Sequence, residues 1–321
     1  MKNTALKGSS KNSIANRQVV SSTLMALASK NKDIVVLTSD SRGSASLVPF
    51  AEALPEQLIE VGIAEQNLVG VAAGLAASGK KPFVASPACF LSMRSIEQIK
   101  VDIAYSKTNV KLIGISGGVS YGALGMSHHS LQDLAVTRAI PNLHVMMPAD
   151  RFETKRMIAA LVDYDTPVYV RIGRNPVADA YVNDQYEFEI GKAVTMRDGR
   201  DITMVAAGET VRVALDAAEI LEAENIRCRV INMHTIKPLD EQAVIKAAEE
   251  TGRIITIEEH SIYGGLGSAV AEVIAQHCPI PVQLLGIPDE PAITGNSKEV
   301  FRHYGLHAEN TANVAKKMIS L

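Results

Sequence analysis

Short apolar segments alternate with amphipathic ones along this chain, and that alternation constrains its fold more than any other feature. Segments such as residues 33–38 (DIVVLT) and 110–115 (VKLIGI) have the continuous apolar character of strands that are buried on both faces. Between such segments, apolar residues recur at helical spacing, as Val20, Leu24 and Leu27 do within residues 17–30. Strands that alternate with helices predict mostly parallel sheets with helices on both faces, which is an α/β fold.

The alternation occurs in two series. The first predicts helices at residues 17–30, 64–78, 95–105, 131–138 and 151–163, and strands at 33–38, 59–62, 81–85, 110–115, 144–147 and 168–172. The second predicts strands at 202–206, 228–232, 253–258 and 282–285, and helices at 210–224, 240–251, 267–276 and from 310 onward. We therefore expect two consecutive three-layer α/β/α domains, residues 13–178 and 201–321, joined by a linker at 179–200 and preceded by a flexible segment at 1–12.

Composition excludes several classes of protein. A length of 321 residues suits two domains, and a net charge of −3 argues against a nucleic-acid-binding surface or a polybasic membrane patch. Cys89, Cys228 and Cys278 lie far apart and form no CxxC pair, which argues against a disulfide framework and a structural zinc site. No apolar segment approaches the ~20 residues of a membrane span. We expect a cytoplasmic protein without a metal site of its own.

Chemically versatile side chains follow the predicted strands of the first domain. Ligands of open α/β sheets bind outside the carboxyl ends of the strands. Asp40, Glu65, Phe90 and the pair His128–His129 each follow such a strand and would face one crevice. Taken alone, each also has a structural interpretation: Asp40 as a helix cap, Glu65 as an acid at a helix start, Phe90 as a core residue.

These residues are more informative when they are considered together with the segments around them. The segment 60–70 (EVGIAEQNLVG), followed by Gly74, residues 79–82 (GKKP), Phe90, and 125–128 (GMSH), resembles the pyrimidine-binding domain of transketolases in order and spacing. Residues 232–240 (NMHTIKPLD), 258–260 (EEH) and 264–267 (GGLG) resemble the transketolase C-terminal domain. The wider group includes deoxyxylulose-phosphate synthase and the β subunits of 2-oxoacid dehydrogenases. Residues 102–105 (DIAY) favour transketolase.

The resemblance implies a thiamine diphosphate enzyme, in which the cofactor acts as an electron sink. Glu65 matches the family's glutamate that hydrogen-bonds the pyrimidine ring nitrogen, and Phe90 matches the residue that stacks on that ring. Asp40 and Ile63 match positions close to the cofactor. The implied reaction moves a two-carbon ketol unit from a ketose phosphate to an aldose phosphate through a thiamine-bound enamine.

The resemblance also implies a substrate site. His128 matches a histidine that contacts the substrate beside the reacting carbon, where it would stabilise developing negative charge. Arg17, Ser44 and Arg174 match positions that bind the substrate phosphate, for which arginines are well suited.

Two positions depart from the family pattern. Ser116 stands where ordinary transketolases have a second histidine, and Leu124 stands where they have an acid that contacts a substrate hydroxyl. An apolar side chain in place of a hydrogen-bonding one suggests a modified or branched donor sugar, such as apulose 4-phosphate.

The chain contains no Gly-Asp-Gly sequence, the element with which the family holds Mg²⁺ and the diphosphate. We therefore expect a separate N-terminal subunit that holds the diphosphate and Mg²⁺, in an α₂β₂ assembly with this chain as β. Alternatives are a deoxyxylulose-phosphate synthase-like enzyme, a 2-oxoacid dehydrogenase β subunit, and a non-catalytic scaffold subunit. Gly264 to Gly267 also resembles a nucleotide loop, although a short glycine run is a weak signal, and the nearby His260 could approach the active site.

Overall fold

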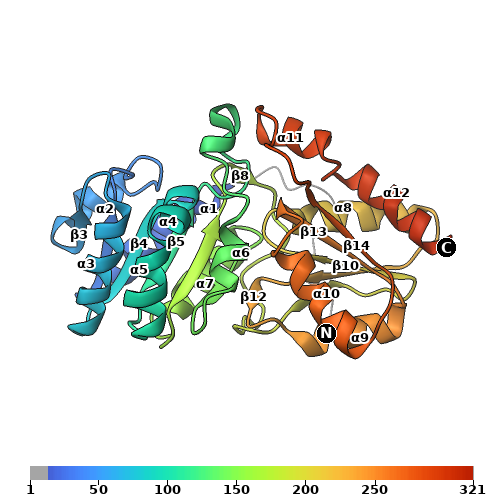
Figure 1. The fold of residues 1–321 in the computed structure, drawn as a ribbon, viewed down its shortest axis with the longest axis horizontal. Helices are drawn as coiled ribbons and strands as arrows, with labels where there is room; N and C mark the ends of the chain where they lie inside the picture. Colours follow the sequence, from blue (N-terminus) through green and yellow to red (C-terminus); the bar gives the residue numbers. More distant parts are fainter. Residues whose placement is uncertain (1–13, 321) are drawn as a thin grey trace.

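The computed structural model describes residues 14–320, so the flexible segment expected at 1–12 lies outside the described residues. Two sheets lie side by side, each flanked by helices (Figure 1). The first has seven strands in the order β12-β6-β7-β5-β4-β2-β3, and the second has five in the order β14-β13-β10-β11-β9. The α/β fold with two mostly parallel sheets is confirmed.

The first sheet is built from parallel strands that are mostly buried on both faces. Its strands are β2 (Ile34–Thr38), β3 (Leu58–Glu60), β4 (Lys81–Pro87), β5 (Lys111–Ile115), β6 (His144–Met146) and β7 (Val168–Ile172). The helices around it are α1 (Asn16–Ala28), α2 (Val48–Ala53), α3 (Glu65–Ala77), α4 (Ala88–Arg94), α5 (Ile96–Gln98), α6 (Asp133–Arg138) and α7 (Arg151–Leu161). Because the strands are parallel, their carboxyl ends meet at one edge.

The second sheet follows a short antiparallel pairing of β1 (Ile14–Ala15) with β8 (Pro176–Val177), which ties the start of the first unit to its end. Its strands are β9 (Val194–Arg197), β10 (Ile202–Ala206), β11 (Cys228–Asn232), β13 (Ile254–Ser261) and β14 (Val282–Ile287), with β9 antiparallel at the edge. Its helices are α8 (Thr210–Ala223), α9 (Glu241–Thr251), α10 (Leu266–His277), α11 (Ser297–His303) and α12 (Ala308–Ile319).

One strand and one apolar core connect the two units. Strand β12 (Thr235–Lys237) comes from the second series but pairs antiparallel with β6 at the edge of the first sheet. One cluster of buried apolar residues runs from Leu37 and Leu68 in the first unit to Val244 and Val270 in the second. The second unit is therefore fixed against the first.

The helix expected at 95–105 is confirmed as α5 followed by the π-helical segment Ile99–Tyr105. Helix α4 comes before it and was not expected, so Phe90 lies on a helix. No helix among residues 14–320 is long and apolar enough to span a membrane.

Candidate active site

The predicted site residues follow the carboxyl ends of adjacent strands in the first sheet. Asp40 follows β2, Glu65 follows β3, Phe90 follows β4, and His128 follows β5. Arg174 follows β7, and Arg17 lies in the first turn of α1, which starts beside it. Parallel pairing of these strands brings side chains that are far apart in the sequence to one edge.

Glu65 is buried at the first position of α3, with 5% of its surface exposed. Its carboxylate accepts hydrogen bonds from Nη1 of Arg94, at 3.0 Å to Oε1 and 3.1 Å to Oε2. The guanidinium carbon of Arg94 lies 4.0 Å from the ring centroid of Phe90. A buried carboxylate beside an aromatic face suits a planar ligand that offers N–H donors at its edge.

Ring contacts connect this carboxylate to the predicted substrate residues. His128 lies edge-on to Phe90, with 5.2 Å between ring centroids, and edge-on to Tyr121, with 5.4 Å between centroids. The guanidinium of Arg174 lies 5.1 Å from the centroid of Tyr121. A continuous series of contacts therefore runs from Glu65 to Arg174, by way of Arg94, Phe90, His128 and Tyr121.

Two arginines meet at the far end of this series. The Arg17 side chain donates to the carbonyl oxygens of Arg174, at 3.0 Å, and of Ser44, at 2.8 Å. Burial and the neighbouring Arg174 guanidinium lower the pKa of Arg17. Among residues 14–320, neither arginine forms an ion pair with a carboxylate, and Nη1 of Arg174 is buried without a hydrogen-bond partner. Two guanidiniums held together in this way suit an anionic ligand.

Asp40 and Ile63 lie at the same edge but outside this series of contacts. Asp40 has a left-handed backbone, with φ of 52°, and its N–H donates to Glu60 at 2.7 Å. The nearest following helix, α2, begins at Val48, so Asp40 is not its cap. Ile63 is 73% exposed. A non-glycine residue in a left-handed conformation is often part of a functional site, which supports Asp40 as a cofactor contact. Ile63 is a candidate for the same role because it is exposed at this edge.

The loop that carries His128 is fastened by the second unit. The carboxylate of Glu259 accepts the N–H of Val119 at 2.8 Å, and Arg171 donates to the carbonyl oxygens of Ser130 and Glu259. A Cβ added at Gly122 would lie 2.8 Å from the carbonyl oxygen of Gly295. Figure 1 shows this loop, in green, beside the start of α11. The position of His128 therefore depends on residues of both units.

The departures Ser116 and Leu124 differ in their surroundings. Ser116 is fully buried at the end of β5, and its hydroxyl has no hydrogen-bond partner in the described chain. Leu124 lies in the 3-10 turn Gly122–Ser127 and is 53% exposed. Next to this turn, the ring of His129 is buried against the carbonyl oxygen of Gly122, and burial lowers the pKa of His129. His129 therefore supports the loop, whereas His128 faces the aromatic rings.

The glycine run 264–267 binds an internal carboxylate. Glu258 accepts the N–H groups of Leu266 and Gly267, both at 2.7 Å, at the start of α10. A Cβ at Gly265 would lie 2.0 Å from a Glu258 oxygen, which explains the glycine. These donors are already satisfied, which argues against a nucleotide phosphate at this loop. His260 is buried beside this carboxylate and Asp133, and its Nδ1 lies 2.7 Å from the carbonyl oxygen of Ser261.

Three residues of the arrangement were missed by sequence reasoning. Arg94 bridges Glu65 and Phe90, Tyr121 bridges His128 and Arg174, and Glu259 holds the loop. Tyr121 carried a signal, because it is the aromatic residue within the glycine-rich segment 117–125. Glu259 lies in the segment 258–260, but the sequence did not indicate its partner, because Val119 is 140 residues away.

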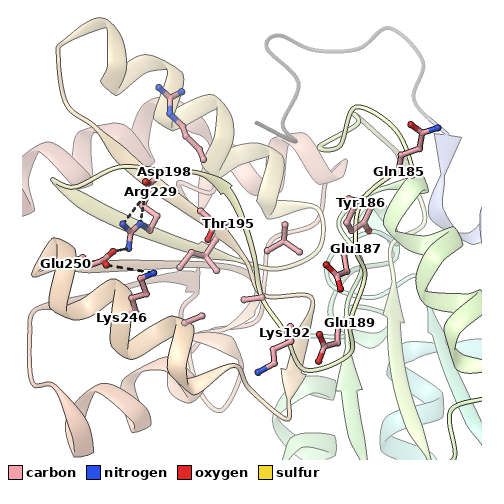
Figure 2. Close-up of a pocket in the computed structure, with 15 residues that line it drawn as sticks. Gln185, Tyr186, Glu187, Glu189, Lys192, Thr195, Asp198, Arg229, Lys246 and Glu250 are labelled. Atoms are coloured by element: carbon pink, nitrogen blue, oxygen red, sulfur yellow. Dashed lines mark hydrogen bonds and ion pairs between the residues drawn. The ribbon is translucent and has the colours of Figure 1, made fainter. Parts of the chain in front are cut away.

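A groove of about 1060 Å³ lies elsewhere, between the linker and the second sheet (Figure 2). None of the predicted site residues lines it. Several of its charged groups form ion pairs, as Arg229 does with both Asp198 and Glu250. We assign it no role in the chemistry. Within residues 14–320, no group of three or more His, Cys, Asp or Glu side chains is arranged to hold a metal ion.

Comparison with known proteins covers nearly the whole chain. Residues 12–178 match the transketolase pyrimidine binding domain, and residues 191–311 match the transketolase C-terminal domain. The chain is 53% identical to an apulose-4-phosphate transketolase subunit of Phocaeicola vulgatus, covering 96% of this chain and 98% of that protein. It is 39% identical to a 6-deoxy-6-sulfo-D-fructose transketolase subunit of Clostridium sp., covering 92% and 91%. A solved structure of a split gene transketolase, described as an inactive β4 tetramer, is 40% identical, with a TM-score of 0.88 and coverage of 96% and 99%.

Proposed function

The chain belongs to the transketolase family, and from that membership we propose that it is the subunit of a two-subunit transketolase that binds the aminopyrimidine of thiamine diphosphate. The pyrimidine binding domain implies this cofactor. The observation that carries the proposal is the buried carboxylate of Glu65, joined to the ring of Phe90 by the Arg94 side chain, with His128 edge-on to the same ring.

The residues at the carboxyl edge fit this cofactor. We assign Glu65 to the ring nitrogen of the aminopyrimidine, with which its carboxylate shares a proton, and Phe90 to the ring face. Asp40 and Ile63 lie at the same edge and complete the cofactor contacts of this chain. When bound, the cofactor supplies an electron sink for cleavage and formation of the carbon–carbon bond.

The substrate residues follow from the same series of contacts. We assign His128 to the substrate oxygen that gains negative charge, since the loop anchored by Glu259 holds this side chain in place. Arg17, with its partner Arg174, binds the substrate phosphate, and Ser44 positions Arg17 through its carbonyl oxygen. No carboxylate among residues 14–320 neutralises these two arginines, which supports an anionic ligand.

The sugar is assigned by similarity. The Phocaeicola vulgatus relative is an apulose-4-phosphate transketolase subunit at 53% identity, so we propose apulose 4-phosphate as the ketose donor. Ordinary transketolases have an acid at the position of Leu124, and that acid contacts a substrate hydroxyl. Leu124 therefore supports a donor that lacks this hydroxyl. The relative that acts on a sulfo-sugar is less similar, at 39% identity.

In this proposal a partner subunit holds Mg²⁺ and the diphosphate, because the sequence has no Gly-Asp-Gly element. We propose an α₂β₂ assembly in the cytoplasm, divided here into a pyrimidine-binding domain at 13–178, a linker at 179–200 and a C-terminal domain at 201–321. The test is calorimetric titration of thiamine diphosphate and Mg²⁺ into this chain alone and into its mixture with the partner subunit. Tight binding by the mixture alone supports a shared site, and tight binding by the chain alone overturns it.

A further inference from the structure

We propose that Arg94 competes with the aminopyrimidine for Glu65 and Phe90, and that the cofactor binds only when Arg94 leaves both groups. This inference rests on the proposed function of those two residues. Arg94 Nη1 donates to both oxygens of Glu65, at 3.0 and 3.1 Å, while its guanidinium carbon lies 4.0 Å from the Phe90 centroid. The same side chain thus uses the carboxylate and the ring face that the cofactor requires.

A guanidinium can replace an aminopyrimidine because the two groups have a similar flat shape and similar hydrogen-bonding edges. Both are planar and delocalised, both offer N–H donors at an edge, and both stack on aromatic faces. A flexible ammonium group could pair with the Glu65 carboxylate but has no flat face to stack on Phe90. The cofactor ring and Arg94 therefore compete for the same space, between the Glu65 carboxylate and the Phe90 ring.

Arg94 can leave Glu65 and Phe90 at a small cost in free energy. It is the last residue of α4, and 48% of its side chain is exposed, whereas only 5% of Glu65 is exposed. Met93 beside it is also exposed, so the side chain can turn toward solvent. A partly exposed ion pair contributes little free energy, so we expect the competition to weaken cofactor binding by a few-fold to about tenfold.

The ion pair between Arg94 and Glu65 stabilises the fold before the cofactor binds. A buried carboxylate without a charged partner destabilises a fold, and Arg94 supplies that partner for Glu65 until the cofactor arrives. Because binding must also displace Arg94, the affinity gained from the aminopyrimidine contacts is reduced by that few-fold to about tenfold factor. The diphosphate contacts of the partner subunit then supply the difference, which links cofactor binding to assembly.

The first test is calorimetric titration of thiamine diphosphate and Mg²⁺ into the assembled two-subunit enzyme. We expect Arg94→Gln to bind the cofactor a few-fold to about tenfold more tightly than the wild type. Arg94→Lys, which keeps the charge but loses the planar stack, should fall between them. Lys80→Gln, which breaks an exposed ion pair with Asp33, is the control and should match the wild type. Equal or weaker binding by Arg94→Gln would overturn the proposal.

The second test is thermal unfolding of the full chain without cofactor, in a double-mutant cycle. Arg94→Gln should lower Tm by about 2–4 °C, and by less when Glu65 is already Gln. Strictly additive effects would show that the two side chains do not interact. If Glu65→Gln leaves the activity of the assembled enzyme at the wild-type level, the proposed function itself fails. If Glu65→Gln is inactive but Arg94→Gln does not tighten binding, only the competition is refuted.

Discussion

The ring of His128 lies edge-on to the ring of Phe90, with 5.2 Å between their centroids and 70° between their planes. One residue follows β5 and the other follows β4, so the contact joins two adjacent strand ends. Their proximity places the group assigned to the substrate beside the group assigned to the cofactor ring.

Replacement of His128 by Asn should lower kcat of the assembled enzyme by about 10²–10³-fold, the usual effect of losing one group that stabilises developing negative charge. Cofactor affinity should be unaffected, because the assigned cofactor contacts belong to other side chains. Steady-state kinetics and calorimetry measure the two effects. His277→Asn, at the exposed end of α10, is the control. Loss of cofactor binding in His128→Asn would refute its assignment to the substrate.

Replacement of Arg174 by Gln should raise KM for a phosphorylated donor by about 10–100-fold, as expected for loss of a hydrogen bond to a charged group. Arg174 is a more specific target than Arg17, whose side chain also donates to three backbone carbonyl oxygens. The check is a comparison of KM for a sugar phosphate and for the same sugar without phosphate. Arg156→Gln, an exposed arginine on α7, serves as control. An equal change for both sugars would contradict a phosphate role.

Replacement of Leu124 by Asp should shift the preference toward unbranched ketose phosphates by roughly tenfold in kcat/KM. Leu124 is 53% exposed, so the substitution should not disturb folding. Competition between apulose 4-phosphate and an unbranched ketose phosphate measures the ratio directly. An unchanged ratio would mean that another position selects the sugar.

Burial raises the pKa of Glu258 from its ordinary 4.5 to about 7. The folded chain therefore binds this proton more tightly than the unfolded chain does, and the resulting stabilisation is complete below about pH 4.5 and lost as pH rises to about 7. We expect the Tm of the wild type, relative to Glu258→Gln, to fall between pH 5 and pH 7 and then to level off. Glu249→Gln, at an exposed site on α9, corrects for general charge effects. A pH-independent difference would contradict the shift.

Most of the fold could be predicted from the sequence, because central strands such as β2, β5 and β7 are buried along their whole length and read as continuous apolar segments. Strand β12 could not, because it has three residues and pairs across the unit boundary. Helix α11 was also missed, although Asn296 and Glu299 form a capping box at its start.

The positions of the site residues could be predicted more readily than their contacts. Glu65, Phe90 and His128 each come after a predicted strand, and residues that follow parallel strands lie at the carboxyl edge of the sheet. Their location at this edge could therefore be predicted. The bridge made by Arg94 depends on α4 beginning directly after β4, which the sequence did not indicate. The anchor from Glu259 depends on packing between units 140 residues apart.

The most direct test of the proposed function is the activity of the assembled enzyme with Glu65→Gln, compared with Glu97→Gln. Glu97 is an exposed glutamate on the adjacent helix α5, hydrogen-bonded to Gln98, so the same chemical change is made nearby. We predict that Glu65→Gln lowers kcat by about 10²–10⁴-fold, the range for loss of a general acid–base group, while Glu97→Gln stays at the wild-type rate. Equal rates for Glu65→Gln and the wild type would contradict the assignment of Glu65 to the cofactor, and with it the proposed function of this chain.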